Sequence, residues 1–228
     1  GVTPVSDHRM TPVRTIMIYR CGTIGDTIVA VPAIQALRRA YPSASFVLMT
    51  ASSPRGFWAD AVLREFGWFD AFVTYDPLDH RPAALKKLLA DIRAVRPDLV
   101  VHLGSDRNSW LRILRDRVFF RLAGISHFVG RAADSVDAFG RLRTDDRIYP
   151  SEVTRLHELA VDAGASSGDP IEFGFPITAS HSAKVDEVLA DRRDHPLLIG
   201  LCPGSKQSSK RWPEDRYADV GRRLITEY

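Results

Sequence analysis

The sequence predicts an α/β fold in which helices cover a parallel sheet, and three observations support this. Short β-branched and aromatic runs alternate along the chain with longer segments of helical periodicity, as in successive βαβ units. The first run leads through a glycine-containing loop straight into a helix. The composition, with 45% hydrophobic and 26% charged residues, is that of an ordinary globular domain.

The expected elements can be placed from these patterns. Strands are expected at residues 15–20, 45–49, 71–75, 99–103 and 197–202. Helices are expected at residues 25–40, 82–95, 109–123, 151–163, 179–191 and 213–228. Residues 131–150 lack clear periodicity and predict an irregular surface loop. Ligands of parallel sheets bind beyond the carboxyl ends of the strands, so the loops after Arg20, Leu103 and Cys202 are where chemistry is expected.

Charge and cysteine content narrow the class of protein. The 228 residues carry a formal net charge of +3 without the Lys/Arg block typical of nucleic-acid binding, so a small anionic ligand suits the chain better. The chain has two cysteines, Cys21 and Cys202, which is too few for a disulfide scaffold. They do not have the spacing of zinc ligands, and we expect both to be buried. No stretch approaches the ~20 apolar residues of a membrane span, and no signal peptide is recognisable, so we expect a cytoplasmic protein.

The chain is expected to divide into three parts. Residues 1–10 are polar and are expected to be disordered or extended. Residues 11–195 form the first α/β domain, and a charged segment precedes the start of a second domain at residue 196. Residues 196–228 supply only one strand, one loop and one helix, which is too little to bury a core. More chain is therefore expected after Tyr228.

The loop after the first strand contains the first candidate site. Gly22 and Gly25 allow the backbone to approach a ligand closely, and Asp26 lies at a helix start, where free N–H groups favour an acid. Asp26 fits two roles, a helix cap or a general base that accepts a proton from a sugar hydroxyl. Pro32 is expected inside the helix, where it bends the axis. The loop lacks the third glycine of a dinucleotide fingerprint, and no Gly-Lys-Ser/Thr sequence follows it.

The loop after the last expected strand contains the second candidate site. It gathers Gly204, Ser205, Lys206 and Lys210 ahead of Pro213, which suits the first position of a helix. Small hydroxyl residues, cations and a helix start together favour an anion such as a diphosphate, whose charge grows as a glycosidic bond breaks. The alternative is a solvated Lys/Ser loop with no ligand.

Other polar residues near the expected strand ends have two interpretations each. The segment 107–121 forms a basic amphipathic helix, which suits an anionic lipid or an acidic acceptor, but also a sheet-packing helix with a solvated arginine face. Arg107, nearest the strand end, is its best candidate for contact with an acceptor. His102 is either a proton-transfer partner or a satisfied polar group at a strand end. Arg155 and His157 are expected on a helix surface.

Two segments of the chain, in order, resemble one family. They read RTIMIYRCGTIGDTIVAVPAIQALRRAYPSASFVLMT and CPGSKQSSKRWPEDRYADVGRRL, and they are similar to glycosyltransferase family 9, the lipopolysaccharide heptosyltransferases and their relatives. Gly25, Asp26 and Pro32 match the family's Gly-Asp loop and Pro-containing helix. The sequence from Lys210 to Pro213 matches its Lys-x-Trp-Pro motif.

The resemblance implies a GT-B fold of two Rossmann-like domains facing a cleft. This chain would supply the N-terminal, acceptor-side domain and the first strand–helix unit of the donor-binding domain. The implied reaction is an inverting, metal-independent transfer of a sugar such as a heptose. The donor is a nucleoside diphosphate sugar such as ADP-heptose, the acceptor is a hydroxyl of a glycan or glycolipid, and no further cofactor takes part. A glycolipid acceptor implies peripheral contact with the inner face of the membrane.

The resemblance also implies roles for single residues. Asp26 is the expected base. The resemblance likewise implies that Ser205 and Lys210 contact the donor phosphates. From their places in the loops at the strand ends, we further expect Gly204 and Lys206 to join the donor-phosphate site. We expect the acceptor to be bound by Gly22, Thr23, Gly25, Thr27, His102 and Arg107.

One departure from the family bears on the acceptor. After the fourth strand the heptosyltransferases usually have an acid followed by Gln-Gly or a similar pair, whereas here His102 takes the place of the acid and Asp106 comes later. A different acceptor chemistry therefore stays open. Two other classes of function also stay open. One is a non-catalytic sugar- or nucleotide-binding module or truncated inactive fragment, and the other is a nicotinamide-dependent oxidoreductase with an aberrant phosphate loop.

Overall fold

The chain divides into two compact units, residues 1–175 and residues 176–228. The structure is a computed structural model and describes residues 13–52, 60, 63–104, 109–134, 136–137, 148–190, 197–205 and 208–227. Residues 1–10, expected to be disordered or extended, lie outside the described residues. Within the described ranges no helix is long and apolar enough to cross a membrane.

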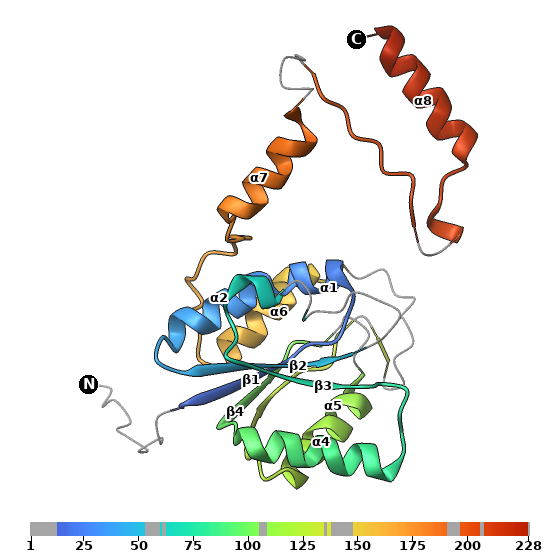
Figure 1. The fold of residues 1–228 in the computed structure, drawn as a ribbon. Helices are drawn as coiled ribbons and strands as arrows, with labels where there is room; N and C mark the ends of the chain where they lie inside the picture. Colours follow the sequence, from blue (N-terminus) through green and yellow to red (C-terminus); the bar gives the residue numbers. More distant parts are fainter. Residues whose placement is uncertain are drawn as a thin grey trace. The chain divides into compact units, whose positions relative to one another are not determined.

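In the described part of the first unit, five parallel strands form one sheet (Figure 1). They are β1 (Thr15–Tyr19), β2 (Ser45–Ala51), β3 (Ala71–Tyr75), β4 (Leu99–His102) and β5 (His127–Val129), in the spatial order β3-β2-β1-β4-β5. In the register of the central strand, Ile18 of β1 is level with Leu48 of β2 and Val101 of β4. The strand order reverses between β1 and β4, so their carboxyl ends form the topological switch point of the sheet.

Helices cover both faces of the sheet (Figure 1). One face carries α1 (Ile24–Val29), α2 (Val31–Ala40) and α6 (Glu152–Asp162), and the other carries α4 (Pro82–Val95) and α5 (Trp110–Leu122). The hydroxyls of Ser109 and Ser151 cap α5 and α6 by accepting the N–H of the residue three positions later. The predicted α/β fold is confirmed, and β1 to β4 begin at the expected residues.

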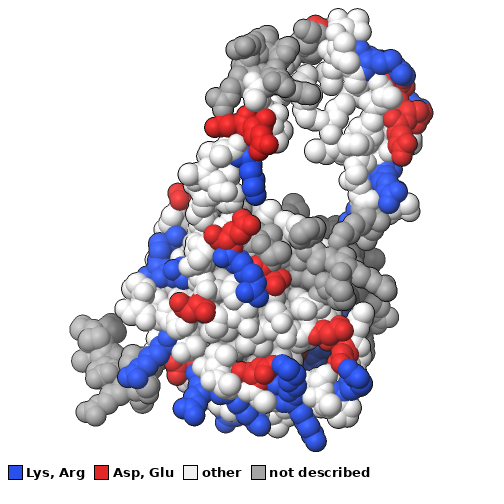
Figure 2. All heavy atoms as spheres, in the orientation of Figure 1, with Lys and Arg blue, Asp and Glu red and all other residues white. Residues whose placement is uncertain are grey.

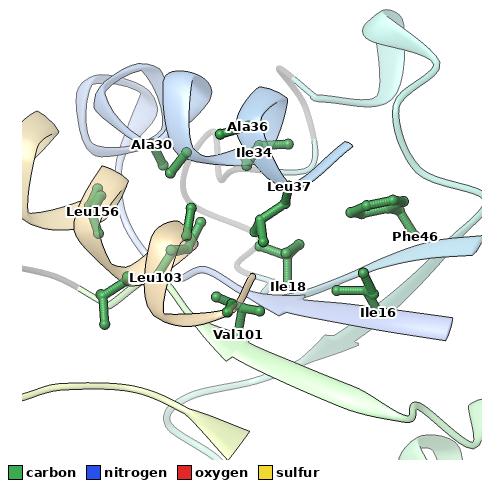
Figure 3. Packing of buried hydrophobic residues seen from close by; sticks show 14 of the residues in the cluster. Ile16, Ile18, Ala30, Ile34, Ala36, Leu37, Phe46, Val101, Leu103 and Leu156 are labelled. Carbon is green, nitrogen blue, oxygen red and sulfur yellow. The ribbon is translucent and has the colours of Figure 1, made fainter. Parts of the chain in front are cut away.

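Successive residues of each strand point to opposite helical layers and form two apolar clusters. The first lies between the sheet, α2 and α6, and includes Ile16, Ile18, Ile34, Leu37, Phe46, Val101, Leu103 and Leu156 (Figure 3). The second lies between the sheet, α4 and α5, and includes Met17, Val47, Ile92, Val100 and Phe120. Both clusters belong to the first unit. Burial on both faces explains why the strand sequences are continuous apolar runs.

One helix is divided where the sequence predicted a continuous one. α1 ends and α2 begins at Ala30, so Pro32 lies in the first turn of α2. The missing N–H of proline is harmless there, because first-turn N–H groups have no partner within the helix. The prediction that Pro32 interrupts a helix interior is therefore wrong.

Two strand predictions also differ from the structure. β5 was not predicted, because three residues with an exposed His127 show no usable periodicity. The expected strand at residues 197–202 is not formed, and Leu197, Leu198, Ile199 and Leu201 are between 44% and 53% exposed. A strand needs a neighbour with which to exchange hydrogen bonds, and the described part of the second unit contains no strand.

The second unit consists mainly of two helices, α7 (Ala179–Val188) and α8 (Glu214–Glu227). The sequence placed α7 in the first domain, with a boundary at residue 196, whereas compactness groups it with the second unit. Cys202 was expected to be buried but is exposed, because the run before it forms no strand. None of the described residues of this unit is buried.

Candidate functional site

The candidate site lies at the carboxyl ends of β1 and β4. β1 leads through a short loop into α1, and β4 leads to Leu103 and Gly104. The N–H of Leu103 donates to the carbonyl of Tyr19 at 3.0 Å, and the N–H of Arg20 donates to the carbonyl of Met49 at 2.9 Å. Both bonds continue the pairing of the sheet beyond the strand ends, so the backbone of the site has a defined position.

Asp26 occupies the third position of α1 and caps the start of its own helix. Its Oδ2 accepts the backbone N–H of Thr23 at 2.6 Å and the hydroxyl of Thr23 at 2.9 Å. Its Oδ1 accepts no hydrogen bond from any described residue. One oxygen therefore fixes the orientation of the carboxylate while the other can accept a proton. The two roles predicted for Asp26, cap and base, are compatible in this geometry.

The two glycines of the loop differ in their packing. A Cβ on Gly22 would lie 2.6 Å from the Cβ of Asp26, so only glycine fits beside this residue. A Cβ on Gly25 would meet nothing closer than the hydroxyl of Thr23 at 4.0 Å. Packing therefore requires glycine at position 22 but not at position 25, where the close approach of a ligand would explain the residue.

Arg20 is a buried arginine that links the loops after β1 and β4. It is 1% exposed; its Nη1 donates to the carbonyl of Leu103 at 2.6 Å, and its Nη2 donates to the carbonyl of Asp26. Burial lowers the pKa of Arg20, and the carboxylates of Asp26 and Glu152 oppose this shift. Arginine remains protonated in proteins, so a buried positive charge lies next to the candidate base.

A second arginine, Arg155 of α6, holds the loop after β4. Its Nη2 donates to the carbonyl of Gly104 at 2.5 Å, and it forms a two-point ion pair with Glu152 at 2.7 and 2.8 Å. Nε of Arg20 and Nη1 of Arg155 are buried without a hydrogen-bond partner among the described residues. Buried donors are almost always paired in proteins. Two donors without a partner therefore mark this edge of the sheet as a candidate place for a polar ligand.

His102 lies on the opposite face of the sheet from Arg20. It is 4% exposed, its Nε2 is 3.2 Å from Oδ2 of Asp116 in α5, and its ring packs edge-on against Tyr19 with centroids 4.6 Å apart. This position fits the alternative of a satisfied polar group and does not support direct contact with an acceptor.

The remaining residues expected to bind the acceptor have different surroundings. Thr23 is exposed, and its hydroxyl donates to Asp26. Thr27 is fully buried and donates its hydroxyl to the carbonyl of Thr23 at 2.9 Å, so it stabilises the start of α1. Arg107 lies outside the described residues.

The second candidate loop, in the second unit, is partly described. Lys206 lies outside the described residues. Nε of Arg211 donates to the carbonyl of Ser205 at 2.6 Å, and a short 3-10 turn, Ser208–Lys210, places Lys210 in an exposed position before α8. Nothing lies within 4 Å of the position that a Cβ on Gly204 would take. The backbone of the loop is thus folded on itself, with its cation and its glycine accessible.

Sequence reasoning missed Arg20 and placed Arg155 on a helix surface. Arg20 carried a usable signal, because a charged residue that closes an apolar strand run must be paired or exposed. Arg155 carried none, because its partner, the carbonyl of Gly104, is fixed by the packing of α6 near β4 and not by any local pattern.

A hollow of about 850 Å³ lies at the other edge of the sheet, lined in part by Asp98, Ser126 and His127. The carboxylate of Asp98 already accepts hydrogen bonds from the backbone N–H groups of Arg14 and Thr15. Ligands of parallel sheets bind at the carboxyl ends of the strands, so we do not assign a substrate to this hollow. In the described ranges, no group of three or more His, Cys, Asp or Glu side chains could hold a metal ion.

Comparison with known proteins agrees with this architecture. Residues 117–227 match the model of glycosyltransferase family 9 (heptosyltransferase). No curated protein matches the sequence.

Three solved structures resemble the chain. The glycosyl transferase family 9 protein of Veillonella parvula has a TM-score of 0.62 and 17% identity, covering 94% of this chain and 60% of that one. ADP-heptose LPS heptosyltransferase II of E. coli has a TM-score of 0.61 and 21% identity, covering 94% and 62%. E. coli heptosyltransferase WaaC, solved with ADP, has a TM-score of 0.50 and 13% identity, covering 90% and 61%.

At these identities the likeness concerns the fold, and the chain spans about 60% of the length of these solved proteins. The likeness shows that this chain shares the Rossmann-like α/β fold of these solved proteins. The family model and the fold together confirm the resemblance of this chain to glycosyltransferase family 9.

Proposed function

We propose that this chain is the acceptor-side part of an inverting, metal-independent glycosyltransferase. The enzyme transfers a sugar from a nucleoside diphosphate sugar to a hydroxyl of a glycan or glycolipid. A heptose donated by ADP-heptose is the first donor to test, because two of the structures with a similar fold are heptosyltransferases, one described with ADP-heptose and one solved with ADP. We further propose a cytoplasmic protein with a peripheral membrane contact.

The observation that carries the proposal is the carboxylate of Asp26 at the switch point of the sheet. Its Oδ2 accepts two hydrogen bonds, and its Oδ1 accepts none from the described residues. With Oδ2 held by Thr23, Oδ1 accepts the proton of the acceptor hydroxyl as that oxygen attacks the anomeric carbon. The bond from the anomeric carbon to the diphosphate breaks in the same step, so the configuration inverts. Arg20 holds the backbone of Asp26 and of Leu103, which fixes the base relative to the loop after β4.

We assign binding of the donor phosphates to Gly204, Ser205, Lys206 and Lys210. A cation and backbone N–H groups stabilise the negative charge that the departing diphosphate gains, without a metal ion. The exposed positions of Gly204 and Lys210 support this assignment. Acceptor contacts are proposed for Gly22, Thr23 and Gly25, which surround Asp26, and for Arg107.

The test is sugar transfer by the complete gene product with Asp26→Asn. Asparagine keeps a side-chain oxygen for the cap but cannot take up the proton, so we expect the rate to fall about 10²- to 10⁴-fold with little change in thermal stability. Asp91→Asn is the matched control, because Asp91 lies on α4 and pairs with Lys87. Transfer by the Asp26 variant at the full rate would show that the base is wrongly assigned.

The competing functions are separated by ligand-induced stabilisation. A sugar nucleotide should raise the midpoint of thermal unfolding of the complete protein, whereas nicotinamide dinucleotide should not. Stabilisation by a sugar nucleotide without any turnover would favour the non-catalytic binding module. Stabilisation by nicotinamide dinucleotide alone would favour the oxidoreductase.

A further inference from the structure

Helix α5 is apolar on two opposite faces. Its inner face places Ile113 and Phe120 against the sheet, where both are buried. Its other large apolar side chains are between 38% and 62% exposed; they are Trp110, Leu111, Leu114, Val118 and Leu122. Four of these recur at every fourth position, so they form one stripe along the side of the helix that faces away from the core. Large apolar side chains gathered on one exposed face of a protein mark an interaction surface.

The charges of α5 have one sign on its exposed surface. Arg112, Arg115, Arg117 and Arg121 are exposed beside the stripe. The only acid of the helix, Asp116, is 8% exposed and pairs with His102 at 3.2 Å and with Arg115 at 2.6 Å. The outward surface of α5 therefore combines an apolar stripe with a positive border.

The neighbouring helix α4 has a different outward surface. α4 carries Lys87 and Asp91 as an ion pair at 2.6 Å, and basic and acidic side chains lie close together along the lower edge of the molecule in Figure 2, over this helix. Its outward face is an ordinary mixed-charge surface.

We propose that the outward face of α5 docks on a membrane surface rich in anionic lipid. Apolar side chains that enter the headgroup boundary, with arginines along the flanks and a tryptophan at one end, are the composition of interfacial helices. Each arginine near an anionic surface is attracted to it. A second copy of the chain fits less well, because a two-fold interface would bring the same arginines of both copies together. The proposal rests on the peripheral membrane contact proposed above and names the surface that makes it, but its observations are those of α5 and not of the transfer reaction.

The test is sedimentation of the 228-residue chain with vesicles, without sugar nucleotide or acceptor. One vesicle set is pure phosphatidylcholine, and the other contains about one third phosphatidylglycerol, so that anionic lipid headgroups are the attracting charge. The variants are Leu114→Ser with Val118→Ser on the stripe, and Arg117→Glu with Arg121→Glu on its border. The control on α4 combines Leu85→Ser with Lys86→Glu, which replaces one exposed apolar residue and one exposed basic residue.

We expect the unchanged chain and the α4 control to bind the anionic vesicles and to bind the neutral ones far more weakly. Each α5 double variant should lose about tenfold or more in affinity for the anionic vesicles while unfolding at the same temperature as the unchanged chain. Equal binding by all variants, or no binding by the unchanged chain, would overturn the proposal. So would a dimer of the unchanged chain in solution that the α5 variants abolish, because the stripe would then be covered by a second copy.

Discussion

Around Asp26, single atoms decide which residues the loop tolerates. Gly22 touches the Cβ side of this residue, Thr23 holds one carboxylate oxygen, and Arg20 holds its backbone carbonyl. The carboxylate thus cannot turn without breaking both of its hydrogen bonds to Thr23, and Arg20 holds the backbone that carries it. A base held in this way loses little conformational freedom when it binds the acceptor hydroxyl.

Gly22 and Gly25 offer a matched pair of substitutions within one loop. Gly22→Ala places a Cβ 2.6 Å from Asp26, so the start of α1 must shift; we expect a loss of about 1–3 kcal/mol in the free energy of unfolding and a strong loss of transfer. Gly25→Ala meets no such contact, and we expect it to fold normally. If a ligand approaches Gly25 closely, this variant should lose affinity for the acceptor. Urea unfolding and the KM for the acceptor separate the two effects, and equal stability losses in both variants would contradict this account.

The role of a single residue could be predicted only where neighbouring residues in the sequence form a recognisable motif. Asp26 stands out because an acid follows a strand and a glycine loop, and its cap follows from its place in α1. The surroundings of His102 could not be foreseen, because they depend on the side of the sheet to which β4 turns that residue. Arg155 was misplaced for a similar reason, since its carbonyl partner is distant in sequence.

At the scale of elements, the ends of β1 and β3 share a partly buried polar cluster. The hydroxyls of Tyr19 and Tyr75 lie 2.7 Å apart, and Sγ of Cys21 lies 3.2 Å from the hydroxyl of Tyr75. Burial raises the pKa of all three groups. Each of them is therefore expected to stay protonated in the folded protein at a pH at which it would ionise in the unfolded chain.

This cluster predicts that the first unit is less stable at alkaline pH. In the unfolded chain, cysteine loses its proton near pH 8.5 and tyrosine near pH 10, whereas the folded protein keeps these protons to higher pH. Stability is therefore fully present below about pH 8.5 and falls as the pH rises, by up to about 1.4 kcal/mol per pH unit for each group. Urea unfolding between pH 7 and 10.5 should show a shallower fall for Tyr75→Phe. Tyr217→Phe, in the second unit, is the control, and identical slopes in all proteins would contradict the prediction.

The boundaries of elements were predictable where a strand or helix is long and packs on the core. β1 to β4 and α4 begin where the apolar runs predict. The prediction was wrong at Pro32, because the first helix ends before the proline and Pro32 lies in the first turn of the next helix, where it causes no strain. The prediction was also wrong at residues 197–202. An apolar run forms a strand only beside a neighbouring strand, and the described residues of the second unit contain none.

At the scale of the whole molecule, the two units differ in how much apolar surface they bury. Every buried residue of the two core clusters belongs to the first unit, and α6 closes one of them through Leu156, Leu159 and Ala160. The described residues of the second unit contain no buried side chain, and the apolar run 197–202 is exposed. The difference follows from length, because a short chain segment cannot enclose a core of its own.

This difference predicts that the first unit carries nearly all of the stability. A fragment of residues 1–175 should unfold cooperatively, with a midpoint within a few degrees of that of the 228-residue chain, when followed by circular dichroism. A fragment of residues 1–150 is the control. It lacks α6, so it exposes the apolar cluster that Leu156 and Leu159 cover, at a cost of roughly 2–5 kcal/mol for each leucine. That loss is comparable to the whole stability of a domain, so the shorter fragment should show no cooperative transition. If the longer fragment also lost its transition, the second unit would have to contribute packing that its exposed side chains do not indicate.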